Sequence, residues 1–312
     1  MPSKRRPDDE GRLLQLVYYA YVAGSRVALA LPERFAYAVA HAAGSLWARL
    51  GSKKRALVTT HMARMTGLPE DSPRVQKLVV AAFKSYARYW LETFRFVREG
   101  REFWLTRFIA PDEHRIDTAL ARGKGVIVVV GHLGNWDAAG AWAGARGNTL
   151  VTVAEVLRPR RMFEFFAEHR AKLGMVIHPA ESGVTTKLVE EVQAGAVVAI
   201  LGDRDLKGTG PEVNFFGEPA TLPAGAASVA MRAGVPVLVA GVYGTELADG
   251  RRGWKADISD PIDVSDIATD DDDSARAELT RRIGAGLEAC IARHPEEWHV
   301  FQPFWIAERK SR

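Results

Sequence analysis

The sequence predicts an α/β protein with a largely parallel central sheet flanked by helices. After Gly123, short apolar runs alternate with helical patterns; the runs are VIVVV from 126, TLVTV from 149, AVVAIL from 196 and VPVLVAGV from 235. Unbroken β-branched runs are typical of strands buried on both faces, as in parallel sheets. With 312 residues, of which 47% are hydrophobic, the chain is long enough to bury a large core.

Residues 12–50 are predicted to form two apolar helices that break at Pro32, the second ending at Gly51. Their apolar surface is wider than the stripe that a surface helix needs, and a basic cluster follows at 53–55. We therefore expect a helix pair that lies in a membrane interface. The alternative is that the same faces pack onto the rest of the protein.

The stretch from 13 to 32 is nearly as long as a transmembrane helix. It contains Arg26, and a charge inside a span costs roughly 2.5 to 3.5 kcal/mol. A cleaved leader is a further alternative, but acidic residues stand at 8–10, where a leader is basic. Association with one membrane surface is favoured over both.

A helix is predicted from about 72 to 99, because apolar side chains recur every three or four residues; they are Val79, Phe83, Tyr86, Trp90 and Phe94. Most of this stripe is expected in the core. The segment TDDDDSARAEL, residues 269–279, starts a helix with acidic residues that suit the helix dipole, so we interpret it as a cap rather than a metal site. With no internal repeat or low-complexity linker, we predict a helical pair at 12–55 and one continuous α/β unit at 56–312.

The composition narrows the possible partners. Lys plus Arg exceeds Asp plus Glu only slightly, 42 to 38, and no basic run is interleaved with aromatic residues, so nucleic acid is not an expected partner. The single cysteine, Cys290, excludes an internal disulfide. The eight histidines are scattered without ligand spacing, so neither a metal nor a resident cofactor is expected.

The most informative motif is GHLGNWD, which follows the strand at 126–130. In a parallel sheet, ligands bind beyond the carboxyl ends of the strands, where His132 emerges. If a helix opens at GNWDAAGAW, Asp137 lies early in it and can accept a hydrogen bond from one ring nitrogen of His132. The other nitrogen is then available as a general base. The alternative is a buried structural histidine.

The chain lacks a serine nucleophile motif of the G-x-S-x-G type, and Cys290 stands in a late helical segment, so a covalent acyl-enzyme is disfavoured. A base acting directly on a substrate hydroxyl needs no enzyme nucleophile. General-base catalysis supplies about 10²- to 10⁴-fold, so donors for an oxyanion are needed as well.

Four separate motifs carry a resemblance to a known family: SYARYWLETFRF, GHLGNWD, GDRDLKGTGPEVNFFGEPATLPAGAA and HPEEWHVFQPFW. They occur in the order found in the bacterial lipid A biosynthesis acyltransferase superfamily. The chain resembles this superfamily from about residue 12 to 307, and within it the actinobacterial phosphatidylinositol mannoside acyltransferases most. The resemblance implies a glycerolipid-acyltransferase-like fold.

It also implies roles for residues. His132 would deprotonate the acceptor hydroxyl, which attacks a thioester directly, and Asp137 would orient the imidazole. The family also has an acidic–Arg–Asp triplet, which is Asp203, Arg204 and Asp205 here. Its first residue, Asp203, would approach the histidine as a second acidic group. An aspartate is a methylene shorter than a glutamate, so the reach of Asp203 to His132 is a point for the structure to decide.

Further residues follow from the same resemblance. Pro159 can open a helix on which Phe163, Phe166, Arg170 and Leu173 share one stripe. Arg170 is expected to meet the thioester oxygen or an acidic partner, with Glu155 as that partner or as a sugar contact. Candidates for phosphate contacts, or alternatively a solvated face, are Arg158, Arg160 and Arg161.

An acyl chain needs an apolar channel, for which the aromatic candidates are Trp136, Trp142, Phe163 and Phe166; each can equally be core. The helix that opens near Gly225 can face an anionic group.

The expected function is acyl transfer from acyl-CoA, as co-substrate, to a mannosyl hydroxyl of phosphatidylinositol mannoside. The protein would be a monomer bound peripherally to the anionic cytoplasmic face of the cell membrane. Alternatives are another glycolipid or lysophospholipid acceptor, an acyl-CoA thioesterase, a non-catalytic lipid-binding protein, and a glycosyltransferase-like sheet that would need a metal or a sugar nucleotide.

Overall fold

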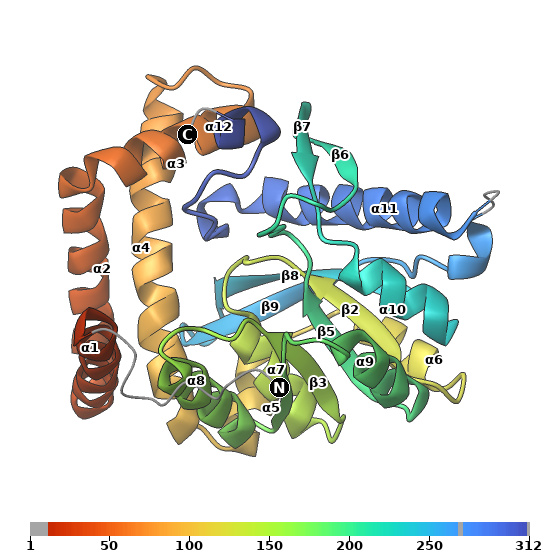
Figure 1. The fold of residues 1–312 in the computed structure, drawn as a ribbon. Helices are drawn as coiled ribbons and strands as arrows, with labels where there is room; N and C mark the ends of the chain where they lie inside the picture. The colour runs from red at the N-terminus through yellow and green to blue at the C-terminus, as the bar shows by residue number, and fades with distance from the viewer. Residues whose placement is uncertain (1–11, 268–270, 311–312) are drawn as a thin grey trace.

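The computed structural model describes residues 12–267 and 271–310 (Figure 1). The acidic residues at 8–10 and the first two residues of TDDDDSARAEL, 269 and 270, lie outside the described residues. The remainder of that segment does open a helix, α11 (Asp272–Arg293), and the Asp271 carboxylate caps it by accepting from the backbone N–H groups of Asp273 and Ser274. The predicted cap is therefore confirmed.

The predicted α/β class is confirmed. The four predicted strands are present as β2 (Val126–Val130), β3 (Leu150–Ala154), β5 (Val197–Leu201) and β8 (Val237–Glu246). Three further strands complete the main sheet: β1 (Phe108–Ile109), β4 (Met175–Pro179) and β9 (Arg252–Ile258). Among the described residues its order is β1-β9-β8-β2-β5-β3-β4, and every pair is parallel except β8 with β9. A separate hairpin joins β6 (Glu212–Phe215) to β7 (Glu218–Thr221).

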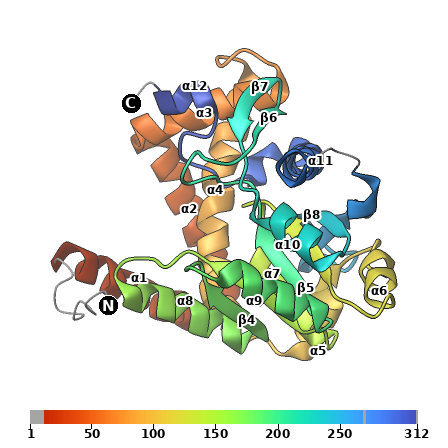
Figure 2. The same ribbon diagram turned by 45° about the vertical axis from the view of Figure 1, so that its right-hand side comes forward.

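Helices cover both faces of this sheet (Figures 1 and 2). One face packs against α9 (Val184–Gln193), α10 (Gly225–Ala233) and α11, and forms the larger core. The other face packs against α5 (Arg101–Arg107), α6 (His114–Leu120) and α7 (Trp136–Ala145). Strand β2 shows how side chains alternate between the two faces: Ile127 and Val129 enter the first core, whereas Val128 and Val130 belong to the second.

The first helices are α1 (Arg12–Ala30), α2 (Glu33–Leu50), α3 (Ser52–Thr66) and α4 (Pro73–Arg95). The break at Pro32 and the end at Gly51 agree with the prediction. One face of α2 is buried along α4, where a Cβ at Gly44 would stand 2.6 Å from the carbonyl oxygen of Phe83. Glycine therefore lets the two helices approach closely. Packing onto the protein thus accounts for one face of this pair.

Large apolar side chains nevertheless remain exposed on α1 and α2; they are Leu14, Leu16, Val17, Tyr19, Val27, Phe35, Val39, Leu46, Trp47 and Leu50. Within residues 12–267 and 271–310, no helix combines the length and the apolar character that crossing a bilayer requires. Association of this surface with a membrane remains a prediction.

The aromatic stripe of α4 has two parts. Val79, Phe83 and Phe94 are buried, as predicted. Tyr86 and Trp90 are only half-buried and line a cavity, so they are wall residues rather than interior packing. Helix α4 therefore connects the N-terminal helices to that cavity.

Helix α8 (Arg160–Lys172) connects β3 to β4 and belongs to a smaller core. Its side chains Met162 and Phe166 pack there with residues of α1, α2 and α4. The N-terminal helices are therefore joined to the α/β unit through both α4 and α8.

The end of the chain packs against its beginning. Helix α12 (Ile306–Lys310) brings Glu308 to α3, where the carboxylate meets Nε2 of His61 at 3.1 Å and Nη1 of Arg64 at 2.6 Å. The Arg64 guanidinium also lies over the ring of Trp305, 4.2 Å from its centre. We call His61, Arg64 and Glu308 the α3–α12 clamp.

Candidate active site

The site begins where β2 ends. The turn from β2 to α7 passes through Gly134, whose φ is +58° and where a Cβ would lie 2.0 Å from the carbonyl oxygen of Val242. Only glycine fits this position. Two backbone hydrogen bonds join this turn to the segment near residue 298. The Gly134 N–H donates to the Glu297 carbonyl, and the His299 N–H donates to the His132 carbonyl at 2.7 Å.

His132 is bound to Asp203, which follows β5, the neighbour of β2 in the sheet. Oδ1 of Asp203 lies 2.6 Å from Nδ1 of His132, and Oδ2 accepts the His132 backbone N–H at 2.8 Å. Oδ2 also accepts from the indole N–H of Trp298 at 2.8 Å. Three donors thus fix this fully buried carboxylate.

These contacts determine the tautomer of the imidazole. Burial by itself raises the pKa of Asp203, but the charge and hydrogen bonds of His132 and the Trp298 N–H outweigh it and leave that pKa below its ordinary value. The carboxylate is therefore ionised and can only accept hydrogen bonds, so in the neutral ring the proton resides on Nδ1. The lone pair on Nε2 is left for another group.

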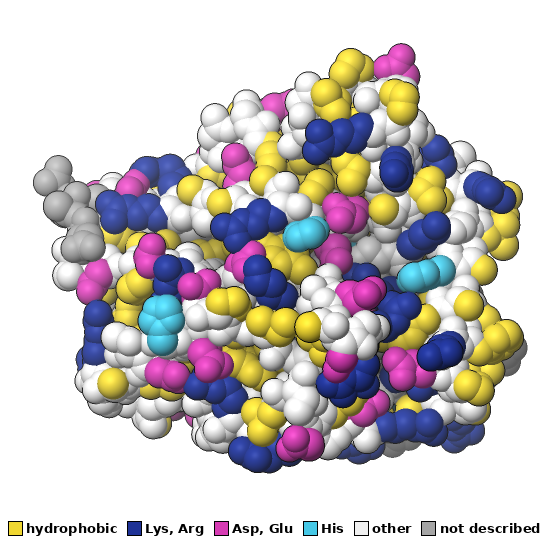
Figure 3. Space-filling view, turned by 180° about the vertical axis from the view of Figure 1, so that it is seen from behind, with side chains coloured by type: hydrophobic (Ala, Val, Ile, Leu, Met, Phe, Trp, Pro, Cys, Tyr) yellow, Lys and Arg dark blue, Asp and Glu magenta, His cyan; other side chains and the backbone are white. Residues whose placement is uncertain are grey.

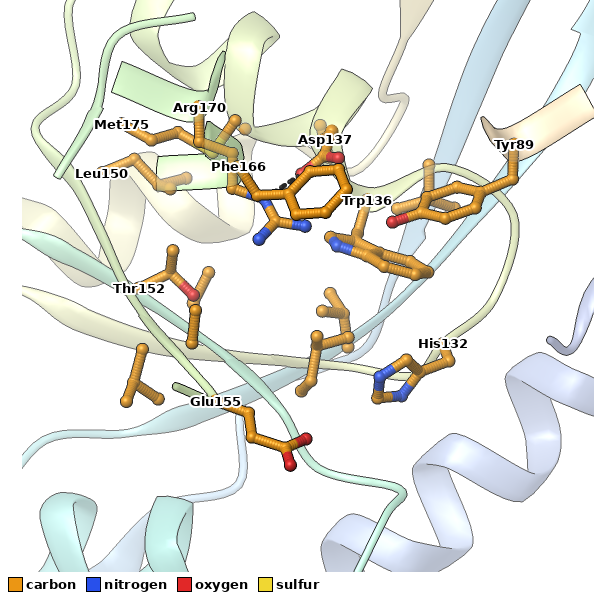
Figure 4. Close-up of a pocket in the computed structure, with 18 of the residues that line it drawn as sticks. Tyr89, His132, Trp136, Asp137, Leu150, Thr152, Glu155, Phe166, Arg170 and Met175 are labelled. Carbon is orange, nitrogen blue, oxygen red and sulfur yellow. Dashed lines mark hydrogen bonds and ion pairs between the residues drawn. The ribbon is translucent and has the colours of Figure 1, made fainter. Parts of the chain in front are cut away.

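Asp137 does not take the place expected for it. It is buried on α7, but Oδ1 accepts from Nε of Arg170 at 2.7 Å, and Oδ2 lies 3.5 Å from the Thr93 hydroxyl. The prediction of a direct hydrogen bond from Asp137 to the imidazole was therefore wrong. Helix α7 directs Asp137 away from His132, and in Figure 4 the Trp136 ring stands between the two. Asp203, 71 residues from His132, has the orienting position instead.

Arg170 comes from α8, which starts after Pro159 as predicted. Burial lowers the pKa of Arg170, but the charge of Asp137 and the hydrogen bonds with Asp137 and Tyr89 raise it above the usual value. A permanent cation is thus held at the cavity wall beside a buried anion. The predicted acidic partner of Arg170 is present, but it is Asp137 and not Glu155. The other expectation for Glu155, a contact to a sugar, stays a prediction; Glu155 stands at the end of β3 and lines the cavity (Figure 4).

A cavity of about 600 Å³ lies between the sheet and helices α4, α7 and α8. His132, Asp137, Glu155, Arg158, Arg170 and Arg204 line it, together with Trp136, Trp142 and Phe166. Its remaining lining is mostly apolar. Aliphatic side chains come mainly from β2, β3, β5, β8 and β9, and aromatic rings come from α1 and α4, namely Tyr21, Tyr86, Tyr89 and Trp90. A ligand bound here would meet a few polar groups at the strand ends and apolar surface beyond them.

Arg204 is the nearest cation to the imidazole. Its Nη1 lies 3.4 Å from Nε2 of His132, and its Nη2 donates to Oε1 of Gln302 at 3.0 Å. Asp205, the last residue of the predicted triplet, has a different role: its carboxylate accepts the backbone N–H groups of Lys207, Gly208 and Gly210. It shapes the loop after β5 and is not among the residues that line the cavity described above.

The remaining predicted residues lie farther out. Phe163 lines a smaller cavity of about 90 Å³ that shares Phe166, Glu155 and Arg170 with the large one. Arg160 is exposed and pairs with Glu164 and Glu181. The helix near Gly225 is present as α10, but its residues are not among those lining either described cavity.

The structure adds residues for which sequence reasoning found no role. Trp298 and His299 lie in HPEEWHVFQPFW, and Tyr89 and Glu92 in SYARYWLETFRF, so the motifs marked them without explaining them. His299 is buried at the cavity wall, where burial and then the charges of Arg88 and His132 lower its pKa far below the usual value. It is therefore neutral.

Glu92 binds Asn135, the residue that precedes α7. Its buried carboxylate accepts from the side-chain N–H of Asn135 at 2.9 Å, from the Tyr37 hydroxyl at 3.1 Å and from the Trp254 indole at 3.3 Å. Burial raises its pKa against the lowering effect of Arg88 and these donors. The carboxylate thus ties α2, α4, β9 and the turn after His132 into one assembly.

Comparison with known proteins identifies the family of this chain. Residues 7–306 match the family described as bacterial lipid A biosynthesis acyltransferase. The chain belongs to this family. A phosphatidylinositol mannoside acyltransferase of Mycobacterium tuberculosis (strain CDC 1551 / Oshkosh) is 34% identical, with 93% of this chain and 89% of the relative covered. One from Mycolicibacterium smegmatis (strain ATCC 700084 / mc(2)155) is 31% identical, with 96% and 95% covered.

Membership makes the protein an acyltransferase of the lipid A biosynthesis family, and the predicted resemblance is confirmed. The cavity at the carboxyl edge of the sheet and the His132–Asp203 pair are the structural features on which we base a proposal for its chemistry.

Proposed function

We propose that this protein transfers a long acyl chain from acyl-CoA to a mannosyl hydroxyl of a phosphatidylinositol mannoside, with His132 as general base. The main support for this proposal is the imidazole at the cavity wall, whose Nδ1 is bound by ionised Asp203 and whose Nε2, 3.4 Å from Nη1 of Arg204, is the nitrogen that would accept the proton. The acceptor is inferred from the relatives, which are named as phosphatidylinositol mannoside acyltransferases.

The reaction requires no acyl-enzyme. Nε2 of His132 takes the proton of the acceptor hydroxyl while the hydroxyl oxygen forms a bond to the thioester carbonyl carbon. The C–S bond then breaks, and the departing thiolate takes the proton back from Nε2. Asp203 stabilises the imidazolium between these two steps, and the guanidinium of Arg204, 3.4 Å from Nε2, is the nearest cation to the developing oxyanion.

The cavity supports an acyl substrate. Burial of a methylene contributes about 0.8 kcal/mol, so a long chain in this largely apolar cavity is the largest available source of binding free energy. Arg158 at the mouth is the candidate for a phosphate of CoA or of the lipid head group, and Glu155 for a contact to the sugar. These two assignments remain proposals.

A peripheral position at the anionic cytoplasmic face of the membrane fits the exposed surface of α1 and α2. Figure 3 shows hydrophobic side chains mixed with Lys and Arg on the molecule seen from behind. Exposed basic residues stand among the apolar ones on these helices and just after them, namely Arg26, Arg34, Arg49 and Lys53. Apolar insertion reinforced by anionic lipid is the expected mode of attachment. Val17 and Tyr21 of α1 also line the cavity, so its mouth would lie at the membrane surface.

The test is mass-spectrometric analysis of products formed by the purified full chain from palmitoyl-CoA and a panel of acceptors. The panel contains phosphatidylinositol mannosides, phosphatidylinositol without mannose, and lysophospholipids. Acylated mannoside is the expected product, and its absence would overturn the assigned acceptor. Release of CoA thiol at equal rates with and without acceptor would instead make the protein a thioesterase.

A further inference from the structure

The strands that line the cavity place their side chains in rows at different distances from His132. Along the sheet, Val128 of β2 pairs with Ala199 of β5, which pairs with Thr152 of β3. Two residues earlier in the strands, Val197 pairs with Leu150, which pairs with Met175 of β4. All six of these residues line the cavity, so they form successive rows at increasing distance from His132.

The distance between rows follows from strand geometry. The row that contains Leu150 lies four residues before the row of Val130 and Leu201, which corresponds to ~13 Å at about 3.3 Å per residue. His132 follows Val130 by two residues. A chain attached at the reaction centre therefore passes the row of Ala199 before it meets Leu150 and Met175.

The far end of this path is closed. Side chains at the mouth are open to solvent, since Leu206 is 55% exposed and Leu157 is 38% exposed. Leu150 and Met175 are only 5% and 6% exposed although both line the same cavity. The cavity thus ends in packed protein along this direction.

Helix α7 packs against the sheet at the same closed end of the cavity. It starts at Trp136 near His132, and Gly140 is one turn farther on and lines the cavity. A Cβ at Gly140 would stand 2.4 Å from Sδ of Met175, so the helix backbone and the thioether are already in contact. Leu150, Met175 and Gly140 together are called the floor.

We propose that the floor sets the longest acyl chain that the enzyme transfers efficiently. This inference rests on the proposed function and deepens it, because it assigns the direction of the chain and the residues that select its length. Each methylene that fits above the floor multiplies affinity about fourfold. A methylene beyond the floor must displace packed side chains, so the gain ends there.

The experiment compares kcat/KM for a series of acyl-CoA donors, from decanoyl to docosanoyl, in the full chain and in two opposing kinds of variant. Ala199→Leu fills the row above the floor, so we expect the preferred acyl chain to become shorter. The value of kcat/KM should fall about tenfold for the longest donors and about twofold or less for the shortest. Met175→Ala removes part of the floor and should move the optimum to longer donors. Leu150→Ala should act in the same direction.

Matched controls separate selection from damage to the fold. Val151→Ala changes the residue next to Leu150, but its side chain lies in the core on the opposite face of β3. It should lower the melting temperature without moving the optimum. If Leu150→Ala does not fold, Leu150→Val supplies a smaller step in the same position.

Ile258 of β9 lines the cavity on its other side and tests the direction of the chain. A shifted optimum in Ile258→Ala together with unchanged optima in the Ala199, Leu150 and Met175 variants would overturn the proposal, because the chain would then run toward β9. Unchanged optima in all folded variants would overturn it as well. Failure of the proposed function is a distinct result, in which the unmutated protein itself shows no acyl transfer from CoA.

Discussion

Two of the histidine–carboxylate pairs among the described residues have similar geometry and different surroundings. His132 and Asp203 meet at 2.6 Å at the edge of the large cavity. His61 and Glu308 meet at 3.1 Å in the α3–α12 clamp, where the His61 ring packs near Trp298 and Trp305, with ring centres 5.8 and 5.0 Å away. Of these two imidazoles, the first lines the cavity described above and the second does not.

The difference shows that the pair of side chains does not make a catalytic base by itself. In the clamp, Glu308 also accepts from Arg64 and from the backbone N–H of Phe304, so its charge joins two ends of the chain. At the cavity, Asp203 holds His132 through the backbone N–H and Nδ1, and both His132 and Arg204, whose Nη1 lies 3.4 Å from Nε2, line the space for a substrate. Access to the second ring nitrogen distinguishes a base from a structural contact.

The strongest test of this comparison exchanges the two histidines for alanine. His132→Ala should lower kcat by about 10²- to 10⁴-fold, the usual contribution of a general base. His61→Ala should keep turnover within about threefold and instead lower the free energy of unfolding by about 1–3 kcal/mol, because it removes a buried hydrogen-bond partner of the Glu308 carboxylate. Steady-state kinetics and denaturant unfolding measure both. Equal activity losses in the two variants would break the comparison.

The Asp137–Arg170 pair provides a second test, because it lies at the same cavity as His132 but does not contact the imidazole. Asp137→Asn should lower the free energy of unfolding by about 3–5 kcal/mol, since it leaves the buried Arg170 cation uncompensated. The double variant Asp137→Asn/Arg170→Met should recover much of that loss in a urea titration. A double variant that is no more stable than the single one would show that the pair has another structural function.

Asp203→Asn tests the orienting carboxylate with nearly unchanged shape. We expect about a 10²-fold loss of kcat with a smaller change of KM, because the amide no longer stabilises the imidazolium. Glu308→Gln is its counterpart in the clamp and should leave kcat nearly unchanged. An Asp203→Asn enzyme with full turnover would contradict the role assigned to this residue.

The smallest expected effect is the acid stability of the clamp. Burial raises the pKa of Glu308, but the hydrogen bond and charge of His61, together with Phe304 N–H and Arg64, lower it from 4.5 to about 2. The stabilisation is therefore complete above about pH 4.5 and is lost as the pH falls through about 2. Thermal unfolding across this range should show wild type and Glu308→Gln converging as the pH falls. A constant difference between them would exclude this linkage.

The sequence predicted the sheet better than the pairings within the site. Runs such as VIVVV identified β2, β3, β5 and β8, because burial on both faces leaves a continuous apolar pattern. Short or mixed strands such as β1, β4 and β9 carry no such pattern and were not predicted. The break at Pro32 and the helix starts near Trp136 and Pro159 were correct, because local residues determine helix ends.

Pairings in the site depend on register between distant segments. The spacing of His132 and Asp137 suggested a direct contact, whereas helix α7 directs Asp137 to Arg170. Asp203 reaches His132 because β5 lies beside β2, and sequence spacing alone does not contain that neighbour relation. The roles of Trp298 and Glu92 were missed for the same reason, although both stand in motifs that the resemblance had marked.

Trp298 has a consequence for the order in which the site is completed during translation. Its indole N–H binds Asp203, yet it is incorporated 95 residues later, and its neighbour His299 holds the backbone of His132. A ribosome-bound chain that contains β2, β5, His132 and Asp203 still lacks the hydrogen bonds from Trp298 and His299 that help to orient this pair. The proposed reaction centre is therefore complete only after this late segment has been synthesised.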